Sequence, residues 1–247
     1  MSGRTPSDEG RVAEAMRRYH EEGFAVLPSV FAPGEVDRWK QECDRLAGVI
    51  AGIDPADSRI QSRGHRQEVT VRDRYDPVTD FSPLFRTLAS DPRLETIAER
   101  VLGGAPVRFK DRLILKSSGT TGYGLHQDWP YWEFLGIPPD EFASLLLSVD
   151  GTDATNGAIE VFPGLHRSEL PAAADEPRDL DPSAVEGHPA RLAATKAGDV
   201  LLLHPMAPHR SGPNLSGGSR RILTYMFTLS RHADAGSRYY AAIPSGG

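Results

Sequence analysis

The chain has 247 residues, with 28 Lys and Arg against 34 Asp and Glu, which gives a formal net charge of −6. No run of Lys and Arg is long enough to form a cationic stripe, so the sequence predicts no nucleic-acid partner. Cys43 is the only cysteine, which excludes an internal disulfide and a thiolate metal cluster. We expect a cytoplasmic protein with no membrane association, because neither a signal-peptide pattern nor an apolar stretch of roughly 20 residues is visible.

Helical spacing of apolar residues dominates the first part of the chain. The spacing predicts a helix over roughly 8 to 22, with Ser7 as its cap and Gly23 at its end. A short strand follows at 24–28. Pro33 is suited to the first turn of a second helix, which carries one apolar stripe and is expected to pack against a sheet. That stripe consists of Val36, Trp39, Cys43, Leu46 and Ile50.

Residues 51 to 81 are polar, with several arginines, Arg66 among them, and an almost equal number of acids. They show no clear periodicity, which predicts a solvated loop or a lid over a functional site. Asp91 and Pro92 then cap a further helix that ends at Gly103. The helical preface therefore spans about 8 to 104.

From Pro106 onward the chain becomes rich in β-forming residues. Short apolar runs separated by Gly and Pro predict an antiparallel barrel or jelly roll, mainly β with added helices. These runs are 107–116, 143–149, 158–162, 200–203 and 222–229. The acidic stretch 167–189 resembles an inserted surface loop. We expect one domain of 247 residues, with its barrel at about 106 to 230.

His126 and Asp128 are the first candidates for metal ligands. If they lie on a strand, both side chains leave the same face, while Gln127 points away. As an isolated triplet this pattern is a weak signal, and a surface histidine beside a paired aspartate is the alternative. Two imidazoles and one carboxylate would form the facial set that binds non-haem Fe(II).

The third ligand must come from elsewhere, and three histidines compete for the role. His204 ends an apolar run, which favours a structural histidine bonded to backbone, and His166 follows a Pro-Gly turn. His209 precedes a polar, glycine-bearing turn, as expected for a ligand at the start of a strand. We prefer His209 because of the residues that follow it.

Arg220 begins the last predicted strand after His209. A guanidinium binds a carboxylate through two parallel hydrogen bonds, as a dicarboxylate cosubstrate on the iron would require. Ser211 can donate its hydroxyl to the same carboxylate. Arg221 is the rival, but neighbours on a strand face opposite ways, so only one of the two arginines points inward; we prefer Arg220.

Several blocks in order resemble the phytanoyl-CoA dioxygenase family of Fe(II)- and 2-oxoglutarate-dependent oxygenases, over about residues 20 to 230. The blocks are 126–128, 156–167, 197–200, 209–214 and 220–221. The resemblance implies a cupin-like double-stranded β-helix with N-terminal helices packed on the barrel. It implies that His126, Asp128 and His209 bind the iron, and that Arg220 and Ser211 bind 2-oxoglutarate.

Other residues near these blocks are open to two interpretations. Lys116 is a weaker candidate for the wall of the site than for a solvated strand end. Trp129, Tyr131 and Trp132 form either an aromatic wall beside the substrate or ordinary packing. Asp128 argues against halogenation, because related halogenases have a small residue there. Leu165 stands where the family commonly has serine, and we expect only a structural effect.

The predicted function is hydroxylation of a small molecule, or its desaturation or cyclisation, in secondary metabolism. Fe(II), 2-oxoglutarate and O2 are the expected cofactor and cosubstrates, and succinate and CO2 are the expected coproducts. Two alternatives remain: a redox-neutral enzyme that uses the same metal ligands, and a non-catalytic binding protein of this fold. The sequence makes no prediction of the oligomeric state.

Overall fold

A computed structural model describes residues 6–64, 70–174 and 179–242. The helices are α1 (Pro6–Glu22), α2 (Pro33–Val49), α3 (Pro83–Leu88), α4 (Pro92–Leu102) and α5 (Ala235–Ala242). The strands are β1 (Phe24–Leu27), β2 (Ile60–Gly64), β3 (Thr70–Tyr75), β4 (Pro106–Lys116), β5 (Tyr123–His126), β6 (Phe142–Ser148), β7 (Ile159–Val161), β8 (Arg191–Ala193), β9 (Val200–Leu203), β10 (His209–Ser211) and β11 (Arg220–Leu229).

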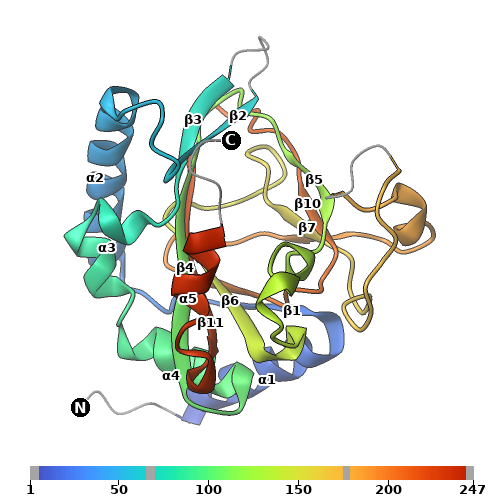
Figure 1. The fold of residues 1–247 in the computed structure, drawn as a ribbon. Helices are drawn as coiled ribbons and strands as arrows, with labels where there is room; N and C mark the ends of the chain where they lie inside the picture. Colours follow the sequence, from blue (N-terminus) through green and yellow to red (C-terminus); the bar gives the residue numbers. More distant parts are fainter. Residues whose placement is uncertain (1–5, 65–69, 175–178, 243–247) are drawn as a thin grey trace.

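The strands form two antiparallel sheets. The large sheet has seven strands in the order β1-β9-β6-β11-β4-β3-β2, and the small sheet has four in the order β5-β10-β7-β8. In Figure 1, α2, α3 and α4 lie along one side of the large sheet, and β5, β10 and β7 lie along the other. The expected double-stranded β-helix with helices packed on it is confirmed.

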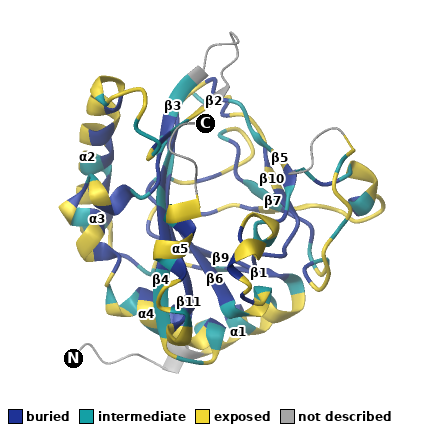
Figure 2. Ribbon diagram, in the orientation of Figure 1, coloured by how far each residue is buried: buried dark blue, intermediate teal, exposed yellow. Residues whose placement is uncertain are grey.

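The large sheet is buried on both faces because its strands alternate two sets of apolar side chains. On the helix side, Leu113, Leu223 and Tyr225 share one core cluster with residues of α2, α3 and α4. On the other side, Leu201 and Ile222 share a cluster with residues of the small sheet. Figure 2 shows these central strands buried, and exposed residues on the outer sides of the helices.

The helices follow the sequence pattern closely. The stripe residues Trp39 and Cys43 are 3% and 0% exposed, as expected for core positions. Asp91 caps α4 by accepting a hydrogen bond from the Arg93 N–H, and Gly103 ends it in the left-handed conformation. The first helix begins at Pro6, so the expected cap at Ser7 is wrong and Ser7 lies within the first turn.

The expected loop over residues 51 to 81 is wrong where the chain forms β2 and β3. β2 and β3 pair with each other, and β3 continues the large sheet beside β4. β2 and β3 contain too few apolar residues to show the alternating pattern of a strand. Tyr75, at the end of β3, is fully buried against α2, and its hydroxyl donates to the Leu46 carbonyl. Arg66 lies outside the described residues. Pairing with a distant strand, rather than a local pattern, forms this hairpin.

Three further elements carried no recognisable signal: α3, α5 and β8. The stretch 167–189 has no strand in its described part, apart from one isolated bridge between Ala172 and Leu180, and forms a short 3-10 turn at Pro182–Val185. None of the described helices combines the length and apolar character that crossing a membrane requires.

Candidate metal centre and cosubstrate site

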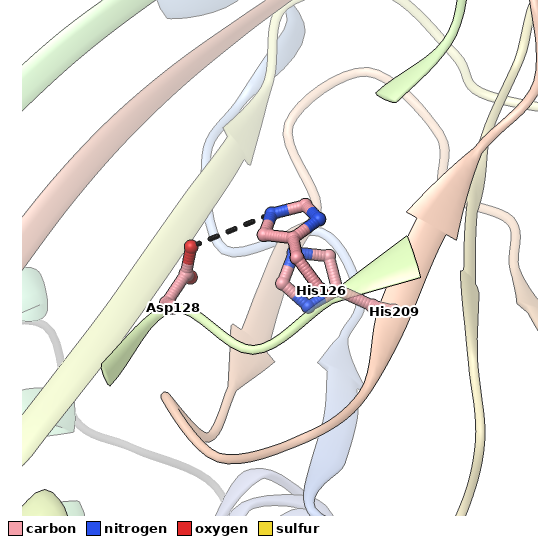
Figure 3. Close-up of side chains that lie close together, drawn as sticks. All are labelled: His126, Asp128 and His209. Carbon is pink, nitrogen blue, oxygen red and sulfur yellow. Dashed lines mark ion pairs between the residues drawn. The ribbon is translucent and has the colours of Figure 1, made fainter. Parts of the chain in front are cut away.

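His126, Asp128 and His209 converge at the end of the small sheet that faces the barrel interior. Each offers a ligand atom, and these atoms lie within 4.8 Å of one another. The His126 Nε2 and Asp128 Oδ1 atoms are 3.7 Å apart, and the two imidazole ring centroids are 4.2 Å apart (Figure 3). Direct pairing of β5 with β10 places His126 opposite His209 in the register.

The carboxylate reaches this position by a turn, not by strand alternation. β5 ends at His126, and Asp128 has helical backbone angles, φ −77° and ψ −36°, immediately before the 3-10 turn Trp129–Tyr131. Pro130 in that turn lacks an N–H and cannot continue a strand ladder. The expectation that His126 and Asp128 share one strand face is therefore wrong, although the turn brings their side chains together.

Both histidines present Nε2 to the centre of the site. His126 Nδ1 lies 2.8 Å from the Gly124 carbonyl oxygen, and His209 Nδ1 lies 2.9 Å from that of Ala207. Because a carbonyl only accepts hydrogen bonds, each Nδ1 carries the proton and each Nε2 keeps a free lone pair. Such backbone bonds fix the tautomer and the ring orientation of metal-binding histidines.

His209 is neutral at physiological pH. Burial lowers its pKa to about 4, and the neighbouring His126 lowers it further in the same direction. A neutral imidazole is the form that binds a metal ion, so no proton has to leave His209 before binding. The side chains of His126 and Asp128 retain 14% and 20% of their exposure, which leaves one side of the site accessible.

A turn at residues 204–207 supports the site through three consecutive carbonyl groups. The Pro205 carbonyl accepts the Asp128 N–H at 2.8 Å, and the Ala207 carbonyl accepts His209 Nδ1–H. The Met206 carbonyl accepts Gln127 Nε2–H at 2.6 Å. The 204–207 turn thus positions both the loop that carries Asp128 and the strand that carries His209.

Gln127 lies behind the ligands and is 1% exposed. Its Nε2 also donates to the Ser168 carbonyl at 2.9 Å, and its Oε1 accepts the Leu170 N–H at 2.9 Å. The carboxamide therefore ties the segment after His166 to the 204–207 turn. Sequence reasoning noted only that Gln127 points away from the ligands, because its partners are distant in the chain.

Arg220, Lys116 and Ser211 form a polar group beside the metal ligands. Arg220 and Lys116 are direct partners in the β11–β4 pairing, and both side chains are buried, at 2% and 0% exposed. Lys116 Nζ donates to Ser211 Oγ at 3.2 Å and to the Gly212 carbonyl. Arg221 points the other way and binds Asp150 at 2.8 Å through Nε.

Arg220 has spare hydrogen-bonding capacity. Its buried Nε has no hydrogen-bond partner in the part of the chain that the structure describes. Burial lowers the Arg220 pKa to about 10, partly offset by Asp73 and Asp150, so the group is still charged at neutral pH. A buried unpaired donor costs about 1 to 3 kcal/mol, so the geometry fits an acidic ligand here.

Gly157 makes room for this polar group. Its φ is +76°, and an added Cβ would lie 2.8 Å from Lys116 Nζ and 2.3 Å from the Gly212 carbonyl oxygen. A larger residue would therefore push against both the backbone and the lysine. This close approach explains why the Asn-Gly pair at 156–157 precedes β7.

The three aromatic residues after Asp128 differ in environment. Trp132 is 2% exposed and packs edge-on against Phe109, so it belongs to the core. Trp129 is partly buried and donates its Nε1–H to the Ile137 carbonyl. Tyr131 is 38% exposed, and its ring centroid is 6.1 Å from that of His126. Tyr131 is thus the aromatic ring that borders the site.

The rival histidines lie together outside the ligand set. His204 Nε2 is 3.1 Å from Asp140 Oδ1, and its Nδ1 accepts the Met206 N–H. His166 packs against His204 with ring centroids 5.0 Å apart, and its Nε2 lies 3.2 Å from the His20 carbonyl. A separate cavity of about 420 Å³ lies near Asp76, Asp111 and Tyr240, and none of the three candidate ligands lines it.

The donor set fits iron. Two neutral imidazoles and one carboxylate, with an accessible side, are the facial arrangement of non-haem Fe(II) sites, whereas zinc sites of the structural kind are closed by four ligands. The fold and the site together define a class: the non-haem iron oxygenases built on a double-stranded β-helix.

Comparisons with known proteins identify the family. The sequence model for phytanoyl-CoA dioxygenase matches residues 19–222, which is most of the chain, so the protein belongs to the phytanoyl-CoA dioxygenase family. It is an oxygenase that depends on non-haem iron and 2-oxoglutarate. The expected family, enzyme class and cofactors are therefore confirmed.

The relatives are distant but extend over most of the chain. Ectoine dioxygenase of Streptomyces anulatus is 26% identical over 250 residues, which covers 92% of this chain and 82% of that protein. Methylphosphonate hydroxylase of Gimesia maris is 24% identical over 226 residues, covering 91% and 83%. The crystal structure of EctD from S. alaskensis with 2-oxoglutarate and 5-hydroxyectoine superposes with a TM-score of 0.75 at 21% identity, covering 88% of this chain and 76% of that one.

Proposed function

We propose that the enzyme hydroxylates a free small molecule, with His126, Asp128 and His209 as its iron ligands. The observation that carries the proposal is the convergence of the three side chains with both Nδ1 atoms tied to backbone carbonyls. The relatives named as acting on ectoine and methylphosphonate support a small polar substrate. We further propose one domain over the whole chain and, from the single buried Cys43 thiol, a cytoplasmic location.

When bound, Fe(II) with 2-oxoglutarate and O2 supplies the oxidising power, with succinate and CO2 as coproducts. The protein holds and orients the reactants. Arg220 binds the distal carboxylate of 2-oxoglutarate through its forked donors, with Ser211 as a further donor. Lys116, buried beside them, adds a second positive charge. The sequence ranked Lys116 below its solvated alternative, because burial of a strand end is decided by tertiary structure.

The neighbouring residues exclude water and shape the entrance. Trp132 and Leu135 pack in the apolar cluster that follows Asp128 in the chain, at 2% exposure each, whereas Tyr131 remains at the rim beside His126. A dry, preorganised site strengthens the charge interactions of the reactants and limits side reactions. The choice of substrate then depends on the inner wall of the barrel.

An anaerobic titration with Fe(II) and 2-oxoglutarate tests the assignment. The wild-type protein should give a visible charge-transfer band, and Asp128→Ala should lose iron binding by more than about 100-fold, beyond the effect of an outer-sphere change. Arg220→Ala should raise the Kd for 2-oxoglutarate about 10- to 100-fold, because the variant loses its hydrogen bonds to the charged carboxylate. Iron binding should be retained.

Arg221→Ala is the matched control, because it removes the adjacent arginine on the opposite face of β11. It should leave the 2-oxoglutarate complex unchanged. Normal cosubstrate binding by Arg220→Ala would refute the role of that arginine. Absence of succinate release with all substrates, despite a normal complex, would favour a binding protein or redox-neutral chemistry.

A further inference from the structure

A second positive group lies on the same inner wall as the cosubstrate site. Lys110, Arg112 and Lys116 are two and four residues apart in β4, with Ile114 between the last two in the same series, so their side chains share one face of the strand. Arg112 is paired with Thr224 of β11, and Lys110 with Met226. This is the face that the large sheet turns toward the small sheet, because the intervening leucines of β4 lie in the helix-side core.

The group has more positive than negative charge. Asp76 Oδ2 lies 3.2 Å from Lys110 Nζ and accepts hydrogen bonds from Arg112 Nε and Nη2 at 2.9 and 2.8 Å. Asp76 Oδ1 accepts the Tyr240 hydroxyl at 3.1 Å. Among the described residues, Asp76 is the one carboxylate in ion-pair contact with either cation. Burial, then repulsion by Arg112, lowers the pKa of Lys110 to about 7, so Lys110 carries its charge only part of the time at neutral pH and Arg112 is the constant cation of the group.

Arg112 is the accessible member of the group. One fifth of its side chain, 20%, is exposed, against 2% for Lys110 and 0% for Asp76. A guanidinium has five N–H donors, and contacts with Asp76 and the Tyr239 hydroxyl do not use all of them. Arg112 can therefore donate to a ligand while Asp76 holds it in place.

The group lies close enough to the iron ligands to share one substrate with them. Lys116, on the same face of β4 as Arg112, donates to Ser211, which lies in β10 two residues from His209. At the other end of the group, Lys110 Nζ donates to the Tyr239 hydroxyl. Trp129, next to Asp128 in the chain, packs against the aromatic cluster that contains Tyr239. A small molecule beside Asp128 would thus come within reach of the Arg112 guanidinium.

We propose that Arg112 binds an oxyanion of the substrate, a carboxylate or a phosphonate, and so selects anionic substrates. Lys110, when protonated, adds positive charge behind it, and Asp76 is a positioning residue that fixes the guanidinium through two of its donors. An anion would compensate the surplus charge of the group, whereas a neutral substrate would leave it unpaired. The inference rests on the proposed function and specifies its substrate class.

The first experiment uses wild-type enzyme with Fe(II), 2-oxoglutarate and matched pairs of probes. The pairs are amino acids with their primary amides, and alkylphosphonates with their neutral diesters. Succinate release should rise above the uncoupled rate with anionic members and not with their neutral partners. The carboxylate and phosphonate arms identify which oxyanion is preferred. The anaerobic charge-transfer band is recorded in parallel, so failure of the proposed function is recognised by its absence.

The second experiment compares Arg112→Met with Arg108→Met. Arg108 is on the same strand and pairs with Asp111, so it controls for loss of a β4 arginine. Arg112→Met should raise KM for the best anionic probe about 10- to 100-fold, the range for a hydrogen bond to a charged group, with the charge-transfer band retained. Arg112→Lys should recover part of the loss, and Arg108→Met should leave KM unchanged.

Two outcomes would overturn the inference while the proposed function stands. One is seen in the succinate assay of an enzyme with a normal charge-transfer band. Neutral probes then stimulate succinate release as strongly as anionic probes, or no anionic probe stimulates it. The other is an unchanged KM in folded Arg112→Met. If Arg112→Met fails to fold, the wild-type comparison of matched probes and the Arg112→Lys variant still decide between the outcomes.

Discussion

The two sheets of this barrel are stabilised in different ways. β4 and β11 have 11 and 10 residues and pair along almost their whole length, within a sheet that is buried on both faces. β5, β7, β8 and β10 have only three or four residues each. The small sheet nevertheless carries two of the candidate iron ligands, and side-chain bonds to backbone, such as those of Gln127, hold it in place. Long ladders thus supply stability, and short strands supply the site.

Removing core volume from the large sheet should have the largest effect on stability. Leu223 is 0% exposed in the helix-side core, and Leu223→Ala should lower the free energy of unfolding by about 2 to 5 kcal/mol. The matched control is Leu192→Ala in β8 of the small sheet. Leu192 is 38% exposed, so this substitution should change the free energy of unfolding by less than about 0.5 kcal/mol. Urea denaturation measures both, and similar losses in the two variants would contradict the comparison.

Acid should weaken the junction between the sheets. His204 follows β9 of the large sheet and starts the 204–207 turn; burial, then repulsion by His166, lowers its pKa to about 4. Its pKa when unfolded is near 6.5, so the unfolded state binds the extra proton as the pH falls. The stability that the protein gains from keeping His204 neutral is complete above about pH 6.5 and is lost toward pH 4. The free energy of unfolding falls by about 3 kcal/mol at most.

Melting temperatures of the metal-free protein between pH 7 and pH 4 measure this loss. His204→Phe should show a smaller fall than the wild type over that window, because the variant keeps the neighbouring His166, His20 and Asp140 and loses only the His204 imidazole. An equal fall in wild type and variant would contradict the role given to His204.

The smallest change should follow from breaking the side-chain support of the small sheet. Gln127→Leu leaves two carbonyls and one N–H without the carboxamide, so iron affinity should fall about 10-fold, the lower end for an outer-sphere support. The free energy of unfolding should fall by about 1 to 3 kcal/mol. Gln41→Leu on the exposed side of α2 is the control and should change neither quantity. Unaltered iron affinity in folded Gln127→Leu would show that the backbone alone positions the ligands.

The sequence by itself determined the features that repeat at short range. The apolar stripe of α2, the cap and glycine of α4 and the β-forming runs of β4, β9 and β11 are local patterns, and the structure has these elements at the expected places. Strand alternation also separated Arg220 from Arg221, which lie on opposite faces of β11. The three candidate ligands were singled out by residue type, motif and order, although the strand reasoning for Asp128 was wrong.

Only the tertiary structure decided how distant segments meet. A local pattern does not show that β3 pairs with β4, that the 204–207 turn holds both Asp128 and His209, or that Asp76 orients Arg112. These contacts join residues far apart in the chain, and they depend on the register and turns of the whole barrel. Burial is decided in the same way: Lys116 is the end of a strand in the sequence and a fully buried side chain in the fold. Periodicity reports the neighbours of a residue along one element, whereas charge pairing and burial depend on all the elements packed around it.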